Sequence, residues 1–442
     1  MLPQRDGVDT LVTTDLLIEG RHFLLDDVTP YELGWKSAAV NISDIAAMGG
    51  KPVASFLSIA LPKDLPVPSG KSAENPDGGC DNGLPSGKSA DNVDGREENG
   101  VPSGKSAENP DGLAEWVDQF IAGFNELSGR FGVRLLGGDT SASDDKLFIN
   151  VTVLGECPHG QAILRSGARP GDLICVTGCL GDSAAGLKLI LERAGGHKMP
   201  EQGLAPPDLR SAHPSQPKGW APPVHVATGG HGSPGPAPAP ADILIHRHYL
   251  PMPRVEFGQQ LAATPGVHAM MDISDGIASD LHHILNASSS SPDADWARSR
   301  FNPDTLPGNM HSTPFYGTSP GKVPASKLDL AQVPMDNDRL CALSAEIDLK
   351  ALPMSEELKT VCAERGWDAT ELAVSGGEDY ELLFTVAPGT ELPEGCTVIG
   401  RIVDSRSEPG MRCEDLGMTG GMSEPGIRWI GSDKDFKGFT HF

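Results

Sequence analysis

Several aspartates in this chain stand beside small or hydroxyl residues at predicted junctions between strands and helices. Asp15 follows two threonines at the end of a short apolar strand, Asp44 lies in an Asn-Ile-Ser-Asp sequence, and Asp139 follows two glycines. Asp272 and Asp275 flank an Ile-Ser pair and precede a glycine. Each alone has an ordinary explanation as a helix cap or turn residue. Together, at the carboxyl edge of an α/β sheet, such carboxylates are typical of a site for magnesium and phosphates.

Alternating strands and helices are expected to position these aspartates. The first α/β unit is predicted to contain strands at 11–14, 53–60, 133–136 and 147–154 and helices at 33–48 and 113–131. The second is predicted to contain strands at 173–177, 267–271 and 380–386 and helices at 183–193, 254–262 and 276–287. A boundary between residues 160 and 171 divides the chain into a first domain, 1–160, and a second, 161–442.

Three segments of unusual composition are predicted to be disordered insertions. In the first, 66–112, three related sequences begin at residues 67, 84 and 101, which is a spacing of 17 residues, and they lack the apolar residues that a folded repeat would bury. The second, 195–241, is rich in Pro, Gly and His, and the third, 288–335, is rich in Ser and Pro. Both are interpreted as mobile surface loops.

Each repeat contains Ser-Gly-Lys-Ser, which resembles the end of a phosphate-binding P-loop. That motif also needs a glycine five residues before its second glycine, and Leu65, Asn82 and Asn99 occupy those positions. The repeats are therefore not interpreted as a nucleotide site.

Composition excludes some partners. The chain has 60 acidic and 35 basic residues and a net charge of −25, which opposes binding to nucleic acid. An acidic protein that handles phosphates needs positive charge from elsewhere, and bound divalent cations are the usual source. The eight cysteines form no Cys-x-x-Cys pair, and no apolar run is long enough for a signal peptide or a membrane helix. A cytoplasmic protein with reduced thiols and no membrane partner is expected.

Five segments in order resemble the signature sequences of thiamine-monophosphate kinase. They are residues 13–23, 41–49, 137–140, 271–276 and 375–384, and residues 437–442 are similar to the C-terminus of that family. The resemblance implies the two-domain α/β (α+β) fold of the aminoimidazole ribonucleotide synthetase-like superfamily, with homodimers that pair through the first domain. It also implies ATP-dependent, magnesium-dependent phosphorylation of thiamine monophosphate to thiamine diphosphate. Family members carry a further N-terminal Gly-Asp-Asp segment whose aspartate binds metal, and this sequence begins after that point.

Roles for individual residues follow from the resemblance alone. The implied magnesium ligands are Thr13, Thr14, Asp15, Asp44, Asp139, Asp272 and Asp275. The implied ATP contacts are Gly138, Asp139, Arg165 and Ser274, and the implied contacts to thiamine monophosphate are His22, Glu378 and Phe436. No catalytic residue is expected beyond these ligands, because the attacking group is the substrate's own phosphate and transfer is expected to be direct.

Several of these residues also have purely structural interpretations. Arg165 suits a surface salt bridge, Glu378 a solvated turn, Phe436 a core position and His22 a structural histidine. Two alternatives to the whole assignment are another ATP-using enzyme of the same fold and a non-catalytic nucleotide-binding protein.

Overall fold

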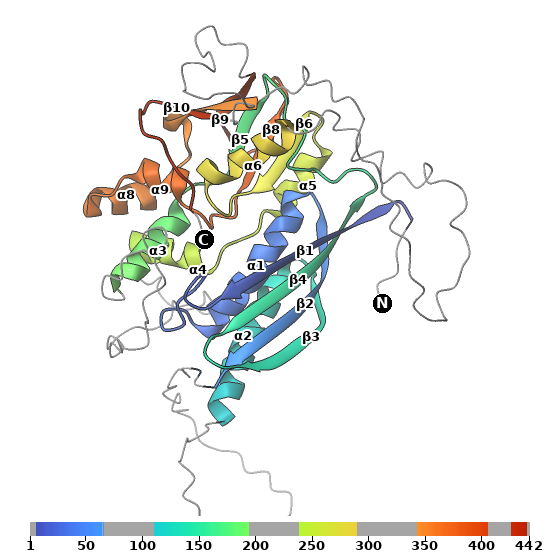
Figure 1. Ribbon diagram of the computed structural model, residues 1–442, viewed down its shortest axis with the longest axis vertical. Coiled ribbons are helices and arrows are strands. Elements are labelled where there is room, and N and C mark those ends of the chain that lie inside the picture. Colours follow the sequence, from blue (N-terminus) through green and yellow to red (C-terminus); the bar gives the residue numbers. More distant parts are fainter. Residues whose placement is uncertain are drawn as a thin grey trace, which may run out of the picture.

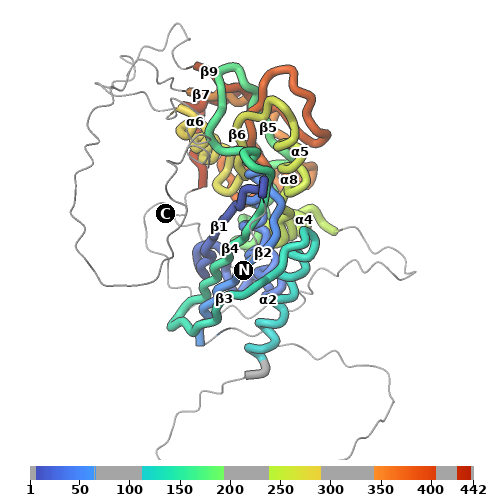
Figure 2. The backbone as a smooth tube through the Cα atoms, turned by 90° about the vertical axis from the view of Figure 1, so that its right-hand side faces the viewer, coloured from blue at the N-terminus to red at the C-terminus, as the bar shows by residue number. Residues whose placement is uncertain are grey.

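The computed structural model describes residues 6–63, 65, 110–193, 238–289, 343–404 and 426–439. The repeats and almost all of the three predicted insertions lie outside the described residues. Two β-sheets with helices packed on them form the described part of the chain (Figures 1 and 2).

The first sheet has four strands in the order β1-β4-β2-β3. These strands are β1 (Val8–Ile18), β2 (Lys51–Pro62), β3 (Arg134–Ser143) and β4 (Phe148–Pro158). β4 pairs antiparallel with both β1 and β2, and β2 pairs parallel with β3. Side chains alternate between the two faces of each strand, so Leu11, Thr13, Asp15 and Leu17 share the inner face of β1, while Val12, Thr14 and Leu16 share its exposed outer face.

Two helices cover the inner face of this sheet, α1 (Pro30–Ala47) and α2 (Pro110–Arg130) (Figure 1). A capping box between Thr29 and Glu32 fixes the start of α1, and Pro30 occupies a first-turn position that needs no backbone donor. Almost every side chain of α1 is buried, including the polar Lys36, Asn41 and Ser43. A polar residue inside such a helix needs a specific partner.

The second sheet has six strands in the order β10-β7-β9-β5-β8-β6. These strands are β5 (Leu173–Thr177), β6 (Val267–Asp272), β7 (Leu343–Asp348), β8 (Leu382–Val386), β9 (Cys396–Asp404) and β10 (Ile427–Ile430). The helices of this part are α3 (Asp182–Arg193), α4 (Pro240–Tyr249), α5 (Val255–Ala263), α6 (Ile277–Ser289), α8 (Glu356–Arg365) and α9 (Ala369–Ser375), with a 3₁₀ turn η3 (Leu349–Ala351).

Helix α1 lies where the two halves of the chain meet. It contacts α5 and β6 of the second half as well as β1 and β4 of the first. The Ser43 hydroxyl donates a 2.6 Å hydrogen bond to Asp272 at the end of β6. The segment between β4 and β5 connects the two sheets and contains the position at which the domain boundary is predicted.

All twelve elements expected from the sequence are present, but two placements were wrong. Residues 13–15 lie in the middle of β1 and not at its end, and residues 137–140 lie within β3 and not after it. The sequence patterns missed α4, α8, α9, β7, β9 and β10. No helix within the described ranges is both long and apolar enough to cross a membrane.

Candidate functional site

A cavity of about 210 Å³ opens where β1, α1, the end of β6 and the segment before β8 meet. It is lined by Asp15, Leu16, Leu17, His22, Val40, Asp44, Asp272, Ser274, Asp275, Glu378 and Tyr380. Seven of the thirteen residues singled out from the sequence are in this set. They come from segments as far apart as β1 and β8, so the fold brings most of the predicted site together.

Hydrogen bonds between β1 and α1 hold one wall of the cavity. The backbone N–H of Asp15 donates to the side-chain oxygen of Asn41 at 3.1 Å. The Thr13 hydroxyl donates to the Asp44 carboxylate. Because Thr13 and Asp15 lie two residues apart on one face of a strand, both point toward the same side of α1. The Asn-Ile-Ser-Asp sequence thus uses its Asn and Ser to fix neighbouring segments, and its Asp faces the cavity.

Another wall is formed by the end of β6, which carries Asp272, and by the loop between β6 and α6, which carries Ser274 and Asp275. Backbone N–H groups of Ser274 and Asp275 donate to one oxygen of Asp280 at 3.0 and 3.1 Å. Asp280 therefore organises this loop from within α6. Asp280 caps the backbone of this loop, and the sequence analysis did not select this residue.

Burial and mutual repulsion make the carboxylates of the cavity prefer their protonated forms. Burial, with repulsion from Asp44, raises the pKa of Asp15 to about 6. Burial and the Asp44 charge raise the pKa of Asp272 to about 7. Burial also raises the pKa of Asp44, against the opposing effects of the Thr13 hydrogen bond and the Arg165 charge. These carboxylates gain from a bound cation in place of the protons.

The donor set fits magnesium. It offers several carboxylate oxygens and a serine hydroxyl facing one space, and none of the eleven lining residues is a lysine or arginine. Hard divalent cations prefer such oxygen ligands. Asp15, Asp44 and Asp272 are the residues placed to hold the ion, with Asp275 at the same cavity.

Glu378 enters the cavity from a segment with unusual backbone geometry. Glu378 and Tyr380 both have positive φ, 64° and 50°, which is uncommon for residues other than glycine. The backbone N–H of Glu378 donates to the Ser274 carbonyl at 2.8 Å. A Cβ on Gly377 would lie 2.3 Å from that same carbonyl oxygen, so only glycine permits the two segments to approach this closely. The strained segment thereby places Glu378 next to Ser274.

The side chain of the buried Lys36 forms an ion pair with Glu378. The Lys36 ammonium, 1% exposed, lies 3.1 Å from the Glu378 carboxylate and 3.3 Å from Nε2 of His248. Burial and the Lys36 charge lower the pKa of His248 to about 3, so its ring is neutral. Because an ammonium only donates, Nε2 accepts and Nδ1 carries the proton, directed toward the Ser183 hydroxyl at 3.0 Å.

Six of the thirteen predicted residues do not line the cavity, and four of these six lie on β1 and β3. Thr14 lies on the outer face of β1, where its hydroxyl donates to the Val151 carbonyl at 3.2 Å. Gly138 and Asp139 lie on β3, which is exposed, and the Ser141 hydroxyl donates to Asp139 at 3.1 Å. A Cβ on Gly138 would lie 1.6 Å from the Leu57 carbonyl oxygen, so this position requires glycine because β2 runs close beside it.

Arg165 and Phe436, which also lie outside the cavity lining, differ in their exposure to solvent. Arg165 is exposed and acts on Asp44 through its charge. Phe436 is buried in the core of the second half, with its ring centroid 5.2 Å from that of Trp429. Phe436 thus lies in a core position, which is the structural interpretation that the sequence analysis left open for it.

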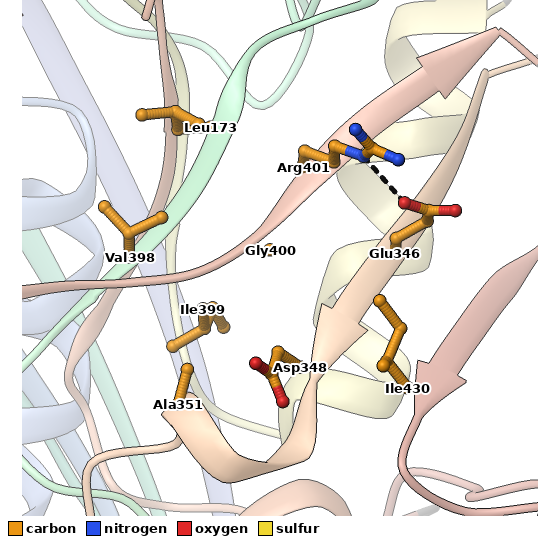
Figure 3. Close-up of a pocket in the computed structure, with 9 residues that line it drawn as sticks. All are labelled: Leu173, Glu346, Asp348, Ala351, Val398, Ile399, Gly400, Arg401 and Ile430. Atoms are coloured by element: carbon orange, nitrogen blue, oxygen red, sulfur yellow. Dashed lines mark hydrogen bonds and ion pairs between the residues drawn. The ribbon is translucent and has the colours of Figure 1, made fainter. Parts of the chain in front are cut away.

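A second cavity, of about 330 Å³, lies on the second sheet and is formed by residues of β5, β7, β9 and β10 (Figure 3). It contains none of the residues predicted from the sequence. Its clearest polar feature is a 2.6 Å hydrogen bond from Arg401 to the buried Glu346, which face each other in Figure 3. Its other acidic residue, Asp348, accepts a 3.0 Å hydrogen bond from the Lys350 N–H, so this cavity lacks the carboxylate set of the first.

Comparison with known proteins agrees with the fold and with the sequence resemblance. Residues 2–77 and 103–157 match the family model described as AIR synthase related protein, N-terminal domain. The thiamine-monophosphate kinase of Bacillus subtilis (strain 168) is 31% identical over 288 residues, which cover 64% of this chain and 61% of that protein. The Escherichia coli (strain K12) thiamine-monophosphate kinase is 28% identical over 375 residues, covering 85% of this chain and 70% of its own.

Solved structures share the architecture. The structure of AaThiL complexed with AMPPCP and TMP aligns with a TM-score of 0.59 at 24% identity, and the alignment covers 100% of this chain and 89% of AaThiL. The thiamine-monophosphate kinase of Stenotrophomonas maltophilia K279a aligns with a TM-score of 0.55 at 24% identity, covering 98% and 89%. The expected aminoimidazole ribonucleotide synthetase-like fold is confirmed.

Proposed function

We propose that this chain, which belongs with the thiamine-monophosphate kinases in the aminoimidazole ribonucleotide synthetase-like superfamily, transfers the γ-phosphate of ATP to thiamine monophosphate. One observation carries the proposal. A single cavity joins the carboxylates Asp15, Asp44 and Asp272 to the substrate candidates His22 and Glu378. The cavity therefore offers one end suited to metal and phosphate and another suited to a cationic organic substrate.

The relatives support this choice of reaction. The matched curated proteins carry the name thiamine-monophosphate kinase, and the matched structure holds AMPPCP, an ATP analogue, together with TMP. The match to the Bacillus protein spans less than two thirds of its length, so the activity is a proposal for this chain.

The metal end of the cavity would use the carboxylates whose pKa values burial raises. Asp15, Asp44 and Asp272 would hold magnesium, which cancels the repulsion between the two reacting phosphates when bound. The Ser43 and Thr13 hydroxyls donate to Asp272 and Asp44 and so fix the carboxylate orientations. Ser274, in the same cavity, would donate to an ATP phosphate, and the positive charge of Arg165 acts on Asp44.

The reaction needs no protein nucleophile. An oxygen of thiamine monophosphate, anionic at neutral pH, attacks the γ-phosphorus while the bond to the ADP oxygen breaks, which gives thiamine diphosphate and ADP. The task of the chain is to hold both phosphates in line, and positioning of this kind supplies much of the rate of phosphoryl transfer. Transfer would be direct, without a phosphoenzyme.

The substrate end of the cavity would bind thiamine monophosphate through charge and hydrogen bonds. Thiamine monophosphate carries a cationic thiazolium and an aminopyrimidine, and the carboxylate of Glu378 can accept from the latter's amino group. The Lys36 ammonium lies 3.1 Å from that carboxylate and orients it. His22 lines the same cavity, and its Nδ1 accepts a 3.0 Å hydrogen bond from the Ile18 N–H, which orients its ring.

A homodimer is part of the proposal. The outer face of the first sheet exposes large apolar side chains: Val12 is 61% exposed, Leu16 48% and Leu136 45%. Single exposed apolar residues are ordinary, but a group of them on one sheet face favours a partner surface. A second copy of this chain is the partner that the expected pairing through the first domain requires. Such pairing would bury Thr14 and Asp139, which share that face. A cytoplasmic location likewise remains a prediction.

Incubation with ATP, Mg²⁺ and thiamine monophosphate, followed by chromatography of the products, tests the proposed reaction. The expected products are thiamine diphosphate and ADP in equal amounts. ATP consumption with no thiamine diphosphate, and turnover of a different acceptor, would favour another enzyme of the same fold. ATP binding without any turnover would favour a non-catalytic nucleotide-binding protein.

A further inference from the structure

The start of α6 brings three metal-binding side chains together beside the cavity. Asp275 precedes the helix, Asp280 lies in its first turn, and His283 follows one turn later. One ligand atom from each lies within 4.8 Å of the others. Neither Asp280 nor His283 lines the cavity described above.

Helix geometry explains this convergence. Asp280 and His283 are three residues apart, so their side chains lie on the same helix face. A carboxylate and a histidine at this spacing are a pair that helical metal sites use repeatedly. Asp275 completes the set from the loop, which is fixed to α6 because Asp280 accepts hydrogen bonds from the Ser274 and Asp275 N–H groups.

An unsatisfied oxygen points independently to a ligand. Asp280 is fully buried, and its Oδ2 accepts the two backbone hydrogen bonds. Its Oδ1 has no hydrogen-bond partner among the described residues. Leaving a buried carboxylate oxygen without a partner costs free energy, so native proteins normally supply one. A cation held between Asp280, Asp275 and the exposed His283 would be such a partner.

We propose that Asp275, Asp280 and His283 bind a divalent transition-metal ion such as Mn²⁺ or Zn²⁺. The imidazole decides the class of ion, because nitrogen ligands suit these metals while magnesium prefers oxygen alone. The site differs from the magnesium site proposed at Asp15, Asp44 and Asp272, and of the magnesium candidates it shares only Asp275. The ion would join the loop that carries Ser274 to α6, and solvent reaches it past His283.

Mn²⁺ alone is the probe, without nucleotide or thiamine monophosphate. Pulsed electron paramagnetic resonance of the full chain loaded with Mn²⁺ reports directly whether a ¹⁴N nucleus is bound to the ion. The unsubstituted chain is expected to show nitrogen coupling, and His283→Ala to abolish it. His283 is exposed, so this substitution leaves the fold intact. Mn²⁺ titration should show the affinity of this one site falling by roughly tenfold or more in His283→Ala.

Two matched histidine variants serve as controls. His282→Ala removes the neighbouring ring on α6, and His22→Ala removes the histidine of the carboxylate cavity; both should keep the nitrogen coupling. Asp280→Asn, checked for folding by its melting temperature, should weaken the same site as His283→Ala does. Absence of coupling in the unsubstituted chain, its survival in His283→Ala, or its loss in either control would overturn the assignment.

The kinase proposal does not depend on these outcomes. A chain with kinase activity and no Mn²⁺–nitrogen coupling would refute the transition-metal site alone. A chain without kinase activity could still show the coupling, because the measurement uses no substrate.

Discussion

Substitution of Lys36 by methionine is expected to destabilise the chain strongly. Lys36 is 1% exposed, and its ammonium lies 3.1 Å from the Glu378 carboxylate, whose side chain is 13% exposed. Methionine keeps much of the volume but removes the charge. The largely buried Glu378 carboxylate would then lose this cation, and Nε2 of His248 would lose its donor.

The size of the effect follows from the geometry. Coulomb's law for unit charges at 3.1 Å gives about 5 kcal/mol at an effective dielectric constant of about 20. Removing one partner of a buried pair typically costs about 3–5 kcal/mol, because the other charge stays buried. We expect Lys36→Met to lower the free energy of unfolding within this range. The double variant Lys36→Met/Glu378→Gln should recover much of the loss, since no unpaired charge remains.

Urea unfolding of the four members of this double-mutant cycle measures the coupling between the two side chains. Arg193→Met is the matched control, because Arg193 and Asp242 form an exposed pair at 3.1 Å and such pairs contribute about 0–1 kcal/mol. If Lys36→Met costs no more than the control, or if the double variant is no more stable than the single one, the buried pair does not have the role described.

Three further outcomes are expected. Because burial and the Asp44 charge raise the pKa of Asp272 from 3.8 to about 7, the folded metal-free chain keeps a proton that the unfolded chain releases. The stability that this group contributes is present below pH 3.8 and is lost as the pH rises to about 7, so the free energy of unfolding should fall by about 4 kcal/mol. Melting curves recorded in a chelator should show this loss of stability. Asp272→Asn should make the loss smaller, and Mg²⁺ should restore the stability at pH 8. Leu16→Lys on the exposed outer face should shift a dimer toward monomer in light scattering, and an unchanged mass would contradict the proposed pairing. Deleting 66–109, most of which the repeats occupy, with a short linker should leave kcat within a few-fold, and a collapse of folding or turnover would show that this segment is needed.

The sequence located most of the fold because its strands and helices follow simple hydrophobic periods. The elements it missed fall mainly after the second and third insertions, as with α4 and β7. Strand β10 has four residues, and helix α8 has almost no apolar face, so neither carries a clear periodic signal. The order of strands in the sheets could not be predicted from hydrophobic patterns. The order β10-β7-β9-β5-β8-β6 depends on pairing between segments that are far apart in the chain.

The site was partly predictable for a physical reason. Asp15, Asp44 and Asp272 could be found because each carboxylate stands within two residues of a hydroxyl side chain, although Asp15 proved to lie in the middle of β1 and Asp44 inside α1. Lys36 and His248 could not, because their roles depend on contacts across 212 residues of chain. The apolar residues on both sides of Lys36 in α1 were the available signal for this residue, and Asp280, three residues before a histidine, was a comparable signal on α6.

The magnesium-dependent rate of Asp44→Asn tests the central claim most directly. Asparagine keeps the shape of the side chain but removes the charge that would hold the ion between ATP and thiamine monophosphate. We expect kcat/KM for thiamine diphosphate formation to fall by roughly 10²-fold or more, which is about 2.7 kcal/mol of transition-state stabilisation. The melting temperature should be unchanged or higher, because repulsion among the buried carboxylates is relieved. A stably folded Asp44→Asn variant with undiminished turnover would contradict the proposed metal site.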